Sequence, residues 1–359
     1  MPKLFFGRSP ESEIFAWIAH VLPLCRPKDA WPMSQVNELS EHATLLDYLR
    51  LFRLPNVFTV IADVSMGFLF VHAQLAPVPI FVCLLAASCL LYTAGMVLND
   101  VYDAEIDAIQ RPERPIPAGH ISRRRAQILG FGFLLTGVAA GWLAGYVQPL
   151  GHAMAWRSGA IATALAVCVV LYDAVLKDTL LGPVLMGSCR LLNVLLGMSL
   201  GAPLAEGWSL LGFGGPHWLV AAGIGVYVAG ITWFSRQEAE VSSRLRLTLA
   251  LLTMMAGMGL LGLLHRSLPA DAFRGLQSEG YWLLLLGLLG FTILRRCGMA
   301  IAEPNPKQVQ AAVKHALQSL IMLAAAVTVE VQSQSYYALG MIALLLIPST
   351  ILGRWVYST

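Results

Sequence analysis

Long, almost uncharged apolar runs recur along the whole chain and limit its possible folds more than any other feature. Windows of eighteen or more such residues are long enough to cross a hydrocarbon core of about 30 Å as a helix. Only 13% of the 359 residues are charged, whereas a typical soluble protein carries roughly a quarter. We therefore predict an all-α polytopic membrane protein.

The apolar runs give ten candidate spans, so we expect a bundle of about nine helices, or ten if every run crosses. They cover residues 54–72, 78–98, 127–147, 159–176, 181–203, 217–235, 246–265, 280–295, 309–329 and 336–353. Residues 1–42 are mixed and polar, and we expect a disordered or interfacial extension there. The transmembrane domain is predicted to cover residues 43–355.

Basic residues predict the orientation of the spans. Twenty of the 24 Lys and Arg residues fall on the N-terminal segment, the loops after the even-numbered spans and the C-terminus. The positive-inside rule places that side in the cytoplasm. We expect a multi-pass protein of the cytoplasmic membrane, surrounded by a lipid bilayer and with no nucleic-acid partner. The six cysteines show no ligand spacing, so neither disulfides nor a zinc site is predicted.

A dense polar motif, NDVYDAEIDAIQRPERPIPAGHIS, follows the second span directly. If the helix continues out of that span, Asp100, Asp103 and Asp107 share one face. Three carboxylates on one stripe repel one another, and a divalent cation removes that penalty. An all-oxygen ligand set favours Mg²⁺ or Mn²⁺, and Mg²⁺ usually completes its shell with waters and substrate phosphates.

Two arginines follow the acidic stripe in the same motif. Arg111 and Arg114 alternate with prolines that end the helix and stiffen the return. Arginine is suited to phosphate oxygens, so the motif predicts a metal-bridged phosphate ester. The alternative is a solvated loop whose charges only set topology. That alternative suits residues 123–125, but acidic residues contribute little to topology, so it explains the aspartates poorly.

The same residues resemble the UbiA superfamily of intramembrane prenyltransferases, with its NDxxDxxxD signature followed by RPxRPIPxGxIS. The resemblance implies about nine transmembrane helices around a central cavity open to a cytoplasmic cap. It also implies that Mg²⁺ on two Asp-rich motifs holds an isoprenyl diphosphate, whose ionisation leaves an allylic cation for a lipophilic or aromatic acceptor. Asp100, Asp103 and Asp107 would then bind metal, and Asn99, Arg111 and Arg114 would face the diphosphate.

Two further segments resemble the same superfamily. In LYDAVLKDTLLG, Tyr172 and Lys177 occupy matching positions, and Lys177 is expected to bind diphosphate. A topology anchor and an interfacial aromatic are the plainer alternatives for these two residues. In RLFRLPNVFTV, Asn56 is expected to line the cavity or to form a hydrogen bond between helices.

The second Asp-rich motif of the superfamily, RDxxDxxxD, is altered here. After the sixth span the chain reads ITWFSRQEAEVSSRLRL. With Arg236 aligned, the Asp positions fall on Gln237, Glu240 and Arg244. Glu238 and Glu240 could bind one metal, or Arg236 and Arg244 could replace it as phosphate ligands. This change also leaves a second function open, that of a non-catalytic protein that binds or translocates a prenylated or amphiphilic metabolite.

An arginine inside the fifth span is the last unusual feature. Arg190 and Asn193 share a helix face, and Arg190 would lie about 13 Å deep if the span starts near residue 181. Ionisable residues within spans are usually functional. We predict that Arg190 faces the cavity and binds the diphosphate or a polar acceptor; a structural pair with Asp63 is the alternative. With the altered second motif, this arginine resembles the EboC-like branch of the superfamily.

Overall fold

A computed structural model describes most of the chain, namely residues 43–72, 74–147, 154–201, 209–236, 243–269, 274–332 and 336–353. The predicted N-terminal extension, residues 1–42, lies outside the described residues.

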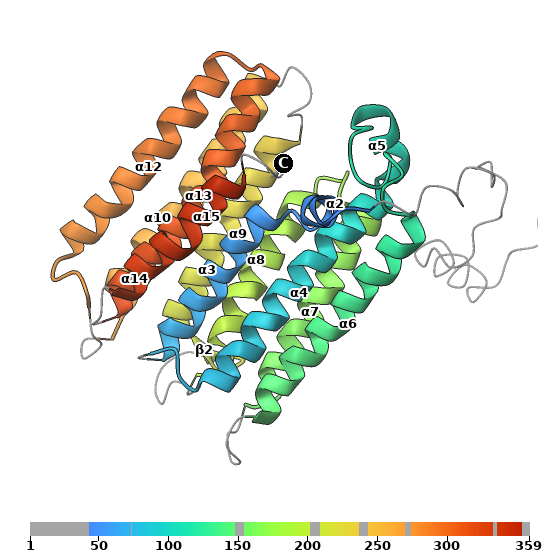
Figure 1. Cartoon of the computed structure of the whole chain (residues 1–359). Coiled ribbons are helices and arrows are strands. Elements are labelled where there is room, and N and C mark those ends of the chain that lie inside the picture. The colour runs from blue at the N-terminus through green and yellow to red at the C-terminus, as the bar shows by residue number, and fades with distance from the viewer. Residues whose placement is uncertain are drawn as a thin grey trace, which may run out of the picture.

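Ten helical passages run through the described part of the chain (Figure 1). They are α3 (Leu54–Val71), α4 (Val78–Tyr102), α6 (Arg123–Val147), α7 (Arg157–Leu171) with the π-turn η1 (Tyr172–Leu176), α8 (Gly182–Met198), α9 (Gly215–Ser235), α10 (Arg244–Gly262) with α11 (Leu264–Ser267), α12 (Glu279–Ala302), α13 (Pro306–Val331), and a last passage made of α14 (Tyr336–Met341), η2 (Ile342–Leu346) and α15 (Ile347–Leu352). The predicted all-α membrane fold is confirmed.

Eight of these passages in the described residues are long and apolar enough to cross a membrane. The other two, α8 and the last passage, are shorter. The fifth span was predicted to reach residue 203, but α8 has only 17 residues and ends at Met198. The last passage is interrupted by the π-turn η2, and a proline stands in the first turn of α15. The chain is thus an integral, multi-pass membrane protein whose passages differ in length.

Short local sequence signals, namely prolines and capping side chains, set where several helices begin. Proline occupies the first turn of α3, α8, α9 and α13, where its missing N–H breaks no helical hydrogen bond. At the start of α13, the side chain of Asn305 also accepts a hydrogen bond from the Gln308 amide. A short helix before the first span, α2 (Leu45–Leu51), begins with a capping box between Thr44 and Asp47.

The bundle is ordered from centre to edge. Helices α3 and α13 are the most buried, whereas α6 and α12 are the least buried and lie at opposite edges (Figure 1). Where α3 crosses α8, two glycines permit close approach. A Cβ on Gly67 would lie 2.5 Å from the Val194 carbonyl oxygen, and one on Gly197 would lie 2.4 Å from that of Val64. Only glycine fits this crossing, which brings the two helices into direct backbone contact.

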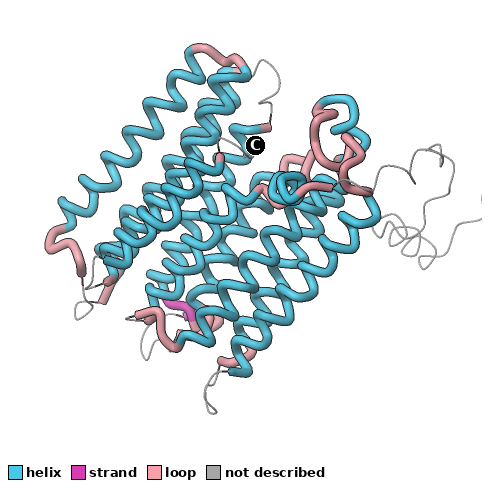
Figure 2. Tube along the Cα trace, viewed as in Figure 1, coloured by secondary structure: helices cyan, strands magenta, loops and turns pink. Residues whose placement is uncertain are grey.

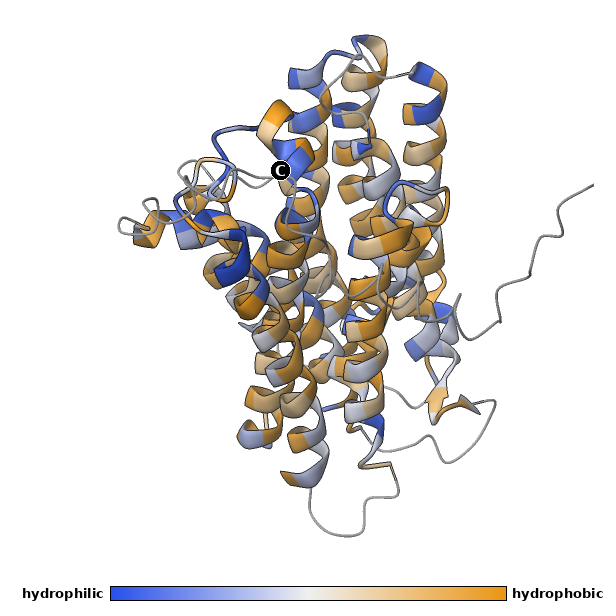
Figure 3. Ribbon diagram, turned by 90° about the vertical axis from the view of Figure 1, so that its right-hand side faces the viewer, coloured by the Kyte–Doolittle hydropathy of each residue, from blue (hydrophilic) through white to orange (hydrophobic). Residues whose placement is uncertain are grey.

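The two ends of the bundle differ. The short helices α2 and α5 (Ala104–Gln110) lie at one end, together with the C-terminal end of the last passage (Figure 1). A two-stranded hairpin, β1 (Ser209–Leu210) and β2 (Phe213–Gly214), lies at the other (Figure 2). Most of the helical ribbon between these ends has the colours of hydrophobic residues (Figure 3). This pattern is typical of helices that face lipid along their length.

Candidate active site

A central cavity of about 530 Å³ lies within the bundle, as predicted. Its walls come from α3, α4, α7, α8, α9 and α13. The apolar part of the lining includes Val60, Leu91, Met96, Leu165, Val169, Met186, Val228, Ile231, Val313 and Leu317. Polar residues concentrate at the α5 end, where Asp103, Arg114 and Lys177 contribute to the lining. The cavity therefore joins a charged mouth to an interior whose walls are mainly apolar.

The acidic motif bends at Asp103, so the prediction of one continuous helix was wrong. Helix α4 ends at Tyr102 and α5 begins at Ala104. Asp103 has φ −83° and ψ −2°, which turns the chain while the backbone hydrogen bonds continue on both sides. The Asp103 amide donates to the Asn99 carbonyl at 2.9 Å, and the Asp107 amide donates to the Asp103 carbonyl at 2.8 Å.

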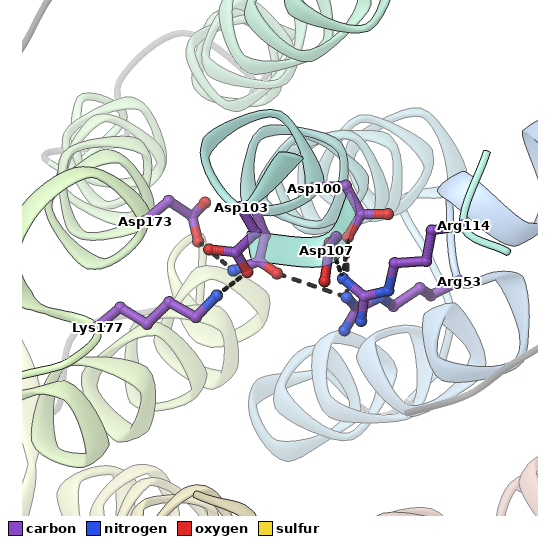
Figure 4. Close-up of polar contacts among 8 residues, drawn as sticks. Arg53, Asp100, Asp103, Asp107, Arg114, Asp173 and Lys177 are labelled. Atoms are coloured by element: carbon purple, nitrogen blue, oxygen red, sulfur yellow. Dashed lines mark hydrogen bonds and ion pairs between the residues drawn. The ribbon is translucent and has the colours of Figure 1, made fainter. Parts of the chain in front are cut away.

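Two arginines hold two of the motif carboxylates (Figure 4). Arg114 Nη1 lies 3.2 Å from Asp100 Oδ1 and 2.6 Å from Asp107 Oδ2. Arg53, at the start of α3, donates to Asp100 Oδ1 at 3.0 Å. Asp100 and Asp107 are buried, and neither belongs to the cavity lining, whereas Arg53 and Arg114 do. The guanidinium groups thus stand between these carboxylates and the cavity.

The third carboxylate of the motif, that of Asp103, pairs with a lysine instead of an arginine. Asp103 forms an ion pair with Lys177, which follows η1 (Figure 4). On the same side, Asn99 Nδ2 donates to Asp173 Oδ1 at 3.2 Å. Asp173 is buried, and its Oδ2 atom has no hydrogen-bond partner among the described residues. The expected acidic stripe is therefore divided between an arginine side and a lysine side.

This division determines which side chains could bind Mg²⁺. Among the described residues, no three His, Cys, Asp or Glu side chains gather in an arrangement that could already hold a metal ion. The donor set nevertheless fits Mg²⁺, because it is all oxygen and because Mg²⁺ needs only one or two carboxylates beside waters and phosphates. The unpartnered Asp173 oxygen adds a free donor atom to that set.

Burial also affects the acidity of the motif. In α5, beyond the end of the span, burial raises the pKa of Asp107, and the neighbouring Arg114 opposes this without cancelling it. The charged form of Asp107 thus depends on its cationic partner.

The return loop is stiff and closes on itself. Gly119 adopts φ 78°, a left-handed conformation that glycine accepts without strain. The Ile121 amide donates to the Pro115 carbonyl at 3.1 Å, and Ile121 is buried against α4 and α6. This loop positions Arg111 and Arg114 at the cavity mouth, as the motif predicted.

The π-turn η1 arranges the next group of predicted residues. The Lys177 amide bonds to the Tyr172 carbonyl at 2.9 Å, and the wide turn leaves Tyr172, Asp173 and Lys177 along the cavity wall. Such π-turns often mark functional sites. Arg236 also lines the cavity, but it donates to the Lys177 carbonyl at 2.8 Å and to the Thr179 carbonyl. Arg236 therefore braces the loop that carries Lys177.

The altered second motif is only partly visible. Glu238 and Glu240 lie in residues 237–242, outside the described residues. Arg244, the other predicted phosphate ligand, donates to the Ala302 carbonyl at 3.0 Å and does not belong to the cavity lining. Arg246 lines the cavity in its place.

The position of Arg190 agrees in part with both predictions made for it, a cavity-facing residue and a structural pair with Asp63. It lines the cavity, as does Asn193. Its Nη1 also donates to Asp63 Oδ2 at 2.7 Å and its Nη2 to Thr59 Oγ1 at 2.9 Å, so the structural pair exists as well. Nearby, Ser88 donates to Asn193 Oδ1 at 2.6 Å. These residues make the deep end of the cavity polar. Asn56 lines the cavity nearer the mouth.

Sequence reasoning missed Arg53 and Asp173. Arg53 stands in the RLFRLPNVFTV segment, three residues before the predicted Asn56. Asp173 stands between the predicted Tyr172 and Lys177. An acid within a span is unusual, and that signal alone would have marked Asp173.

Comparison with known proteins decides the family. The sequence model of the UbiA prenyltransferase family matches residues 60–311. The chain belongs to this family. Solved structures agree on the fold. A UbiA homologue from Archaeoglobus fulgidus, bound to DMAPP and Mg²⁺, has a TM-score of 0.52 at 15% identity and covers 76% of this chain and 99% of its own.

A second solved structure, from work on digeranylgeranylglyceryl phosphate synthase in membranes, has a TM-score of 0.54 at 18% identity. It covers 79% of this chain and 97% of its own. Among sequence relatives, the digeranylgeranylglyceryl phosphate synthase of Metallosphaera sedula is 32% identical over 133 residues, which is 37% of this UbiA chain and 43% of the relative. That of Methanopyrus kandleri is 33% identical over 155 residues, 42% and 53% of the two chains. The matched segments thus span about half of these relatives or less. Placement in the EboC-like branch stays a prediction.

Proposed function

We propose that this protein transfers an isoprenyl group from an allylic isoprenyl diphosphate to a lipophilic or aromatic acceptor, in a Mg²⁺-dependent reaction that ionises the diphosphate. One observation carries the proposal. Carboxylates of the first motif are paired with Arg53, Arg114 and Lys177, and these three cations line the mouth of an apolar cavity. The relatives named as prenyl-lipid synthases and the DMAPP-bound homologue support it.

Binding requires an exchange of partners at this mouth. Arg53, Arg114 and Lys177 turn to the diphosphate oxygens, for which arginine has suitable fork geometry. The released carboxylates of Asp100, Asp103 and Asp107 are then free to hold metal. Bound Mg²⁺ supplies stabilisation of the negative charge on the departing diphosphate. Asn99, Arg111 and Tyr172 stand beside this position, and Arg236 keeps the Lys177 loop in place.

The chemical step breaks the bond between the allylic carbon and the diphosphate oxygen. The bonding electron pair leaves with the diphosphate, whose charge the three cations stabilise. The resulting allylic cation lies between apolar walls that exclude water, a competing nucleophile. An acceptor atom donates an electron pair to the allylic carbon and loses its proton.

The polar residues at the deep end are assigned to the acceptor. Helix α8 begins at Gly182, so Arg190 lies about 12 Å along it from the mouth. That depth separates Arg190 and Asn193 from the diphosphate group held by Lys177. A polar group on the acceptor can meet them there, beside the prenyl tail.

The distribution of Lys and Arg supports a cytoplasmic-membrane location with the α5 end facing the cytoplasm. In that orientation the charged mouth meets a water-soluble diphosphate supply, and the apolar cavity lies within the bilayer.

The test uses purified protein in lipid vesicles with Mg²⁺ and C10 to C20 allylic diphosphates, and it measures pyrophosphate release. We expect metal-dependent release that EDTA abolishes and Asp103→Ala removes. Glu105→Gln is the matched control, because Glu105 belongs to the same acidic segment but is exposed and pairs with Arg123. Binding of the diphosphates without any release would instead support the non-catalytic carrier function that the altered second motif leaves open.

A further inference from the structure

One carboxylate at the cavity wall has no role in the ion pairs described above. Asp173 is 8% exposed and lines the cavity. Its Oδ1 accepts a hydrogen bond from Asn99 Nδ2 at 3.2 Å, and its Oδ2 is buried without a partner among the described residues. Leaving a buried charged oxygen unpaired costs several kcal/mol in general, so such an atom calls for a ligand.

The neighbours of Asp173 point to the kind of ligand. Asp103 and Lys177 are near enough to interact with it electrostatically, and Figure 4 shows all three on the same side of the group. The carboxylates of Asp103 and Asp173 carry like charges and repel each other. The Tyr102 hydroxyl is also buried without a hydrogen-bond partner among the described residues, and it too interacts electrostatically with Asp173. Asp173 and Tyr102 thus each have a buried oxygen without a hydrogen-bond partner among the described residues, and the nearby Asp103 carboxylate is paired with Lys177.

We propose that Asp173, together with Asp103, binds a divalent cation and supplies the carboxylate that the altered second motif lacks. This inference rests on the proposed function, because the cation is the one that accompanies the diphosphate. A divalent cation offsets the repulsion between the two carboxylates and gives Asp173 Oδ2 its missing partner. Lys177, displaced from Asp103, becomes available to the diphosphate.

The position of Asp173 on the cavity wall supports this replacement. The π-turn η1 carries Asp173, and Lys177 follows it directly, on the wall opposite the Arg53–Arg114 side of the mouth (Figure 4). Asp103, from the α4–α5 junction, and Asp173, from η1, then hold the cation together on the lysine side of the mouth.

The test measures binding of Mn²⁺, in place of Mg²⁺, from the loss of its free paramagnetic resonance signal. Protein in lipid nanodiscs is titrated with Mn²⁺ in the presence of inorganic pyrophosphate. Asp173→Asn keeps the shape of the side chain and the acceptor for Asn99 but removes the charge. We expect it to weaken Mn²⁺ binding on the order of tenfold or more, or to remove one bound ion, since even indirect metal partners contribute that much. Glu105→Gln should bind as the wild type does.

An asparagine also imitates a protonated aspartate. The variant therefore separates an ionised Asp173 that binds the cation from a protonated Asp173 that does not. Unchanged Mn²⁺ affinity and stoichiometry in Asp173→Asn, with binding lost in Asp103→Asn, would overturn this inference and leave the proposed function standing. Absence of Mn²⁺ and pyrophosphate binding in the wild type would overturn both. Thermal unfolding of each variant in the same nanodiscs confirms that the comparison is between folded proteins.

Discussion

The guanidinium of Arg190 lies 2.7 Å from the carboxylate of Asp63 inside the bundle, and it joins α8 to α3. Asp63 is fully buried, and Arg190 is almost so. The closely packed glycines Gly67 and Gly197 hold the same two helices together farther along. A polar pair at this depth is stable only because each partner offsets the charge of the other.

Breaking that pair should destabilise the protein. Arg190→Met leaves Asp63 as an uncompensated buried charge, a change that costs about 3–5 kcal/mol in general. We expect a lower midpoint in thermal unfolding of the detergent-solubilised protein. The double variant Asp63→Leu with Arg190→Met removes both charges and should recover most of the loss. If Arg190→Met alone were as stable as the wild type, the pair between Arg190 and Asp63 would not stabilise the protein.

Arg114 should control access to the motif carboxylates. Arg114→Gln removes the cation that Asp100 and Asp107 share. We expect Mn²⁺ to bind more tightly in the absence of diphosphate, because its ligands lose a competitor. Pyrophosphate should bind more weakly, by tenfold or more, since a hydrogen bond to a charged group is worth about 1.5–3 kcal/mol. Both affinities can be measured by calorimetry.

Arg123→Gln serves as the control for Arg114, because Arg123 is exposed and contacts only Glu105 among the ion pairs of the described residues. If both variants changed the two affinities alike, general charge rather than the Arg114 contact would explain the result.

The glycine crossing should tolerate no larger residue. Gly67→Ala places a methyl group 2.5 Å from the Val194 carbonyl oxygen, and overpacking of this kind costs about 1–3 kcal/mol. Gly132→Ala is the matched control, since a Cβ there meets nothing within 4 Å. The control should unfold at the wild-type temperature or slightly above it. Equal midpoints for the two variants in a thermal melt would disprove a tight α3–α8 contact.

The deep end of the cavity should limit the length of the prenyl group. Ser88 and Asn193 line that end and are joined by a 2.6 Å hydrogen bond. Ser88 lies fifteen residues before Asp103 on α4, or about 22 Å along the helix. Ser88→Leu should lower kcat/KM for C20 relative to C10 diphosphate on the order of tenfold. Asn193→Ala should shift the ratio the other way, and an unchanged ratio in both variants would place the tail elsewhere.

Docking of α2 should depend on the charge of Asp47. Burial alone would raise the pKa of Asp47, but hydrogen bonds from Thr44 and His120 outweigh it and hold the pKa below its ordinary value of 3.8. A lowered carboxyl pKa stabilises the fold above the unfolded pKa, and this contribution is lost as pH falls through the folded pKa. We expect amide exchange in α2 to accelerate as pH falls below 3.8. Asp47→Asn should abolish that pH dependence after correction for intrinsic exchange.

The sequence by itself determined the class of the fold, and it predicted the location of the chemistry. Apolar runs of membrane length specify helices that cross a bilayer, because backbone polar groups must be satisfied within the membrane. The spacing of Asp100, Asp103 and Asp107 and the prolines around Arg114 are local patterns. They predicted a diphosphate-binding group at one end of the second span. Of these residues, Asp103 and Arg114 line the cavity, whereas Asp100 and Asp107 do not.

Only the tertiary structure decided which charges meet. Asp63 and Arg190 are 127 positions apart, and Asp103 and Lys177 are 74 apart. Their pairing depends on how each helix is rotated against its neighbours, which hydropathy does not record. The same applies to the bend at Asp103, which divides the acidic stripe. It applies also to Asp173, because only the folded structure shows that its Oδ2 atom is buried without a partner among the described residues. Packing between distant segments, rather than local spacing, sets these contacts.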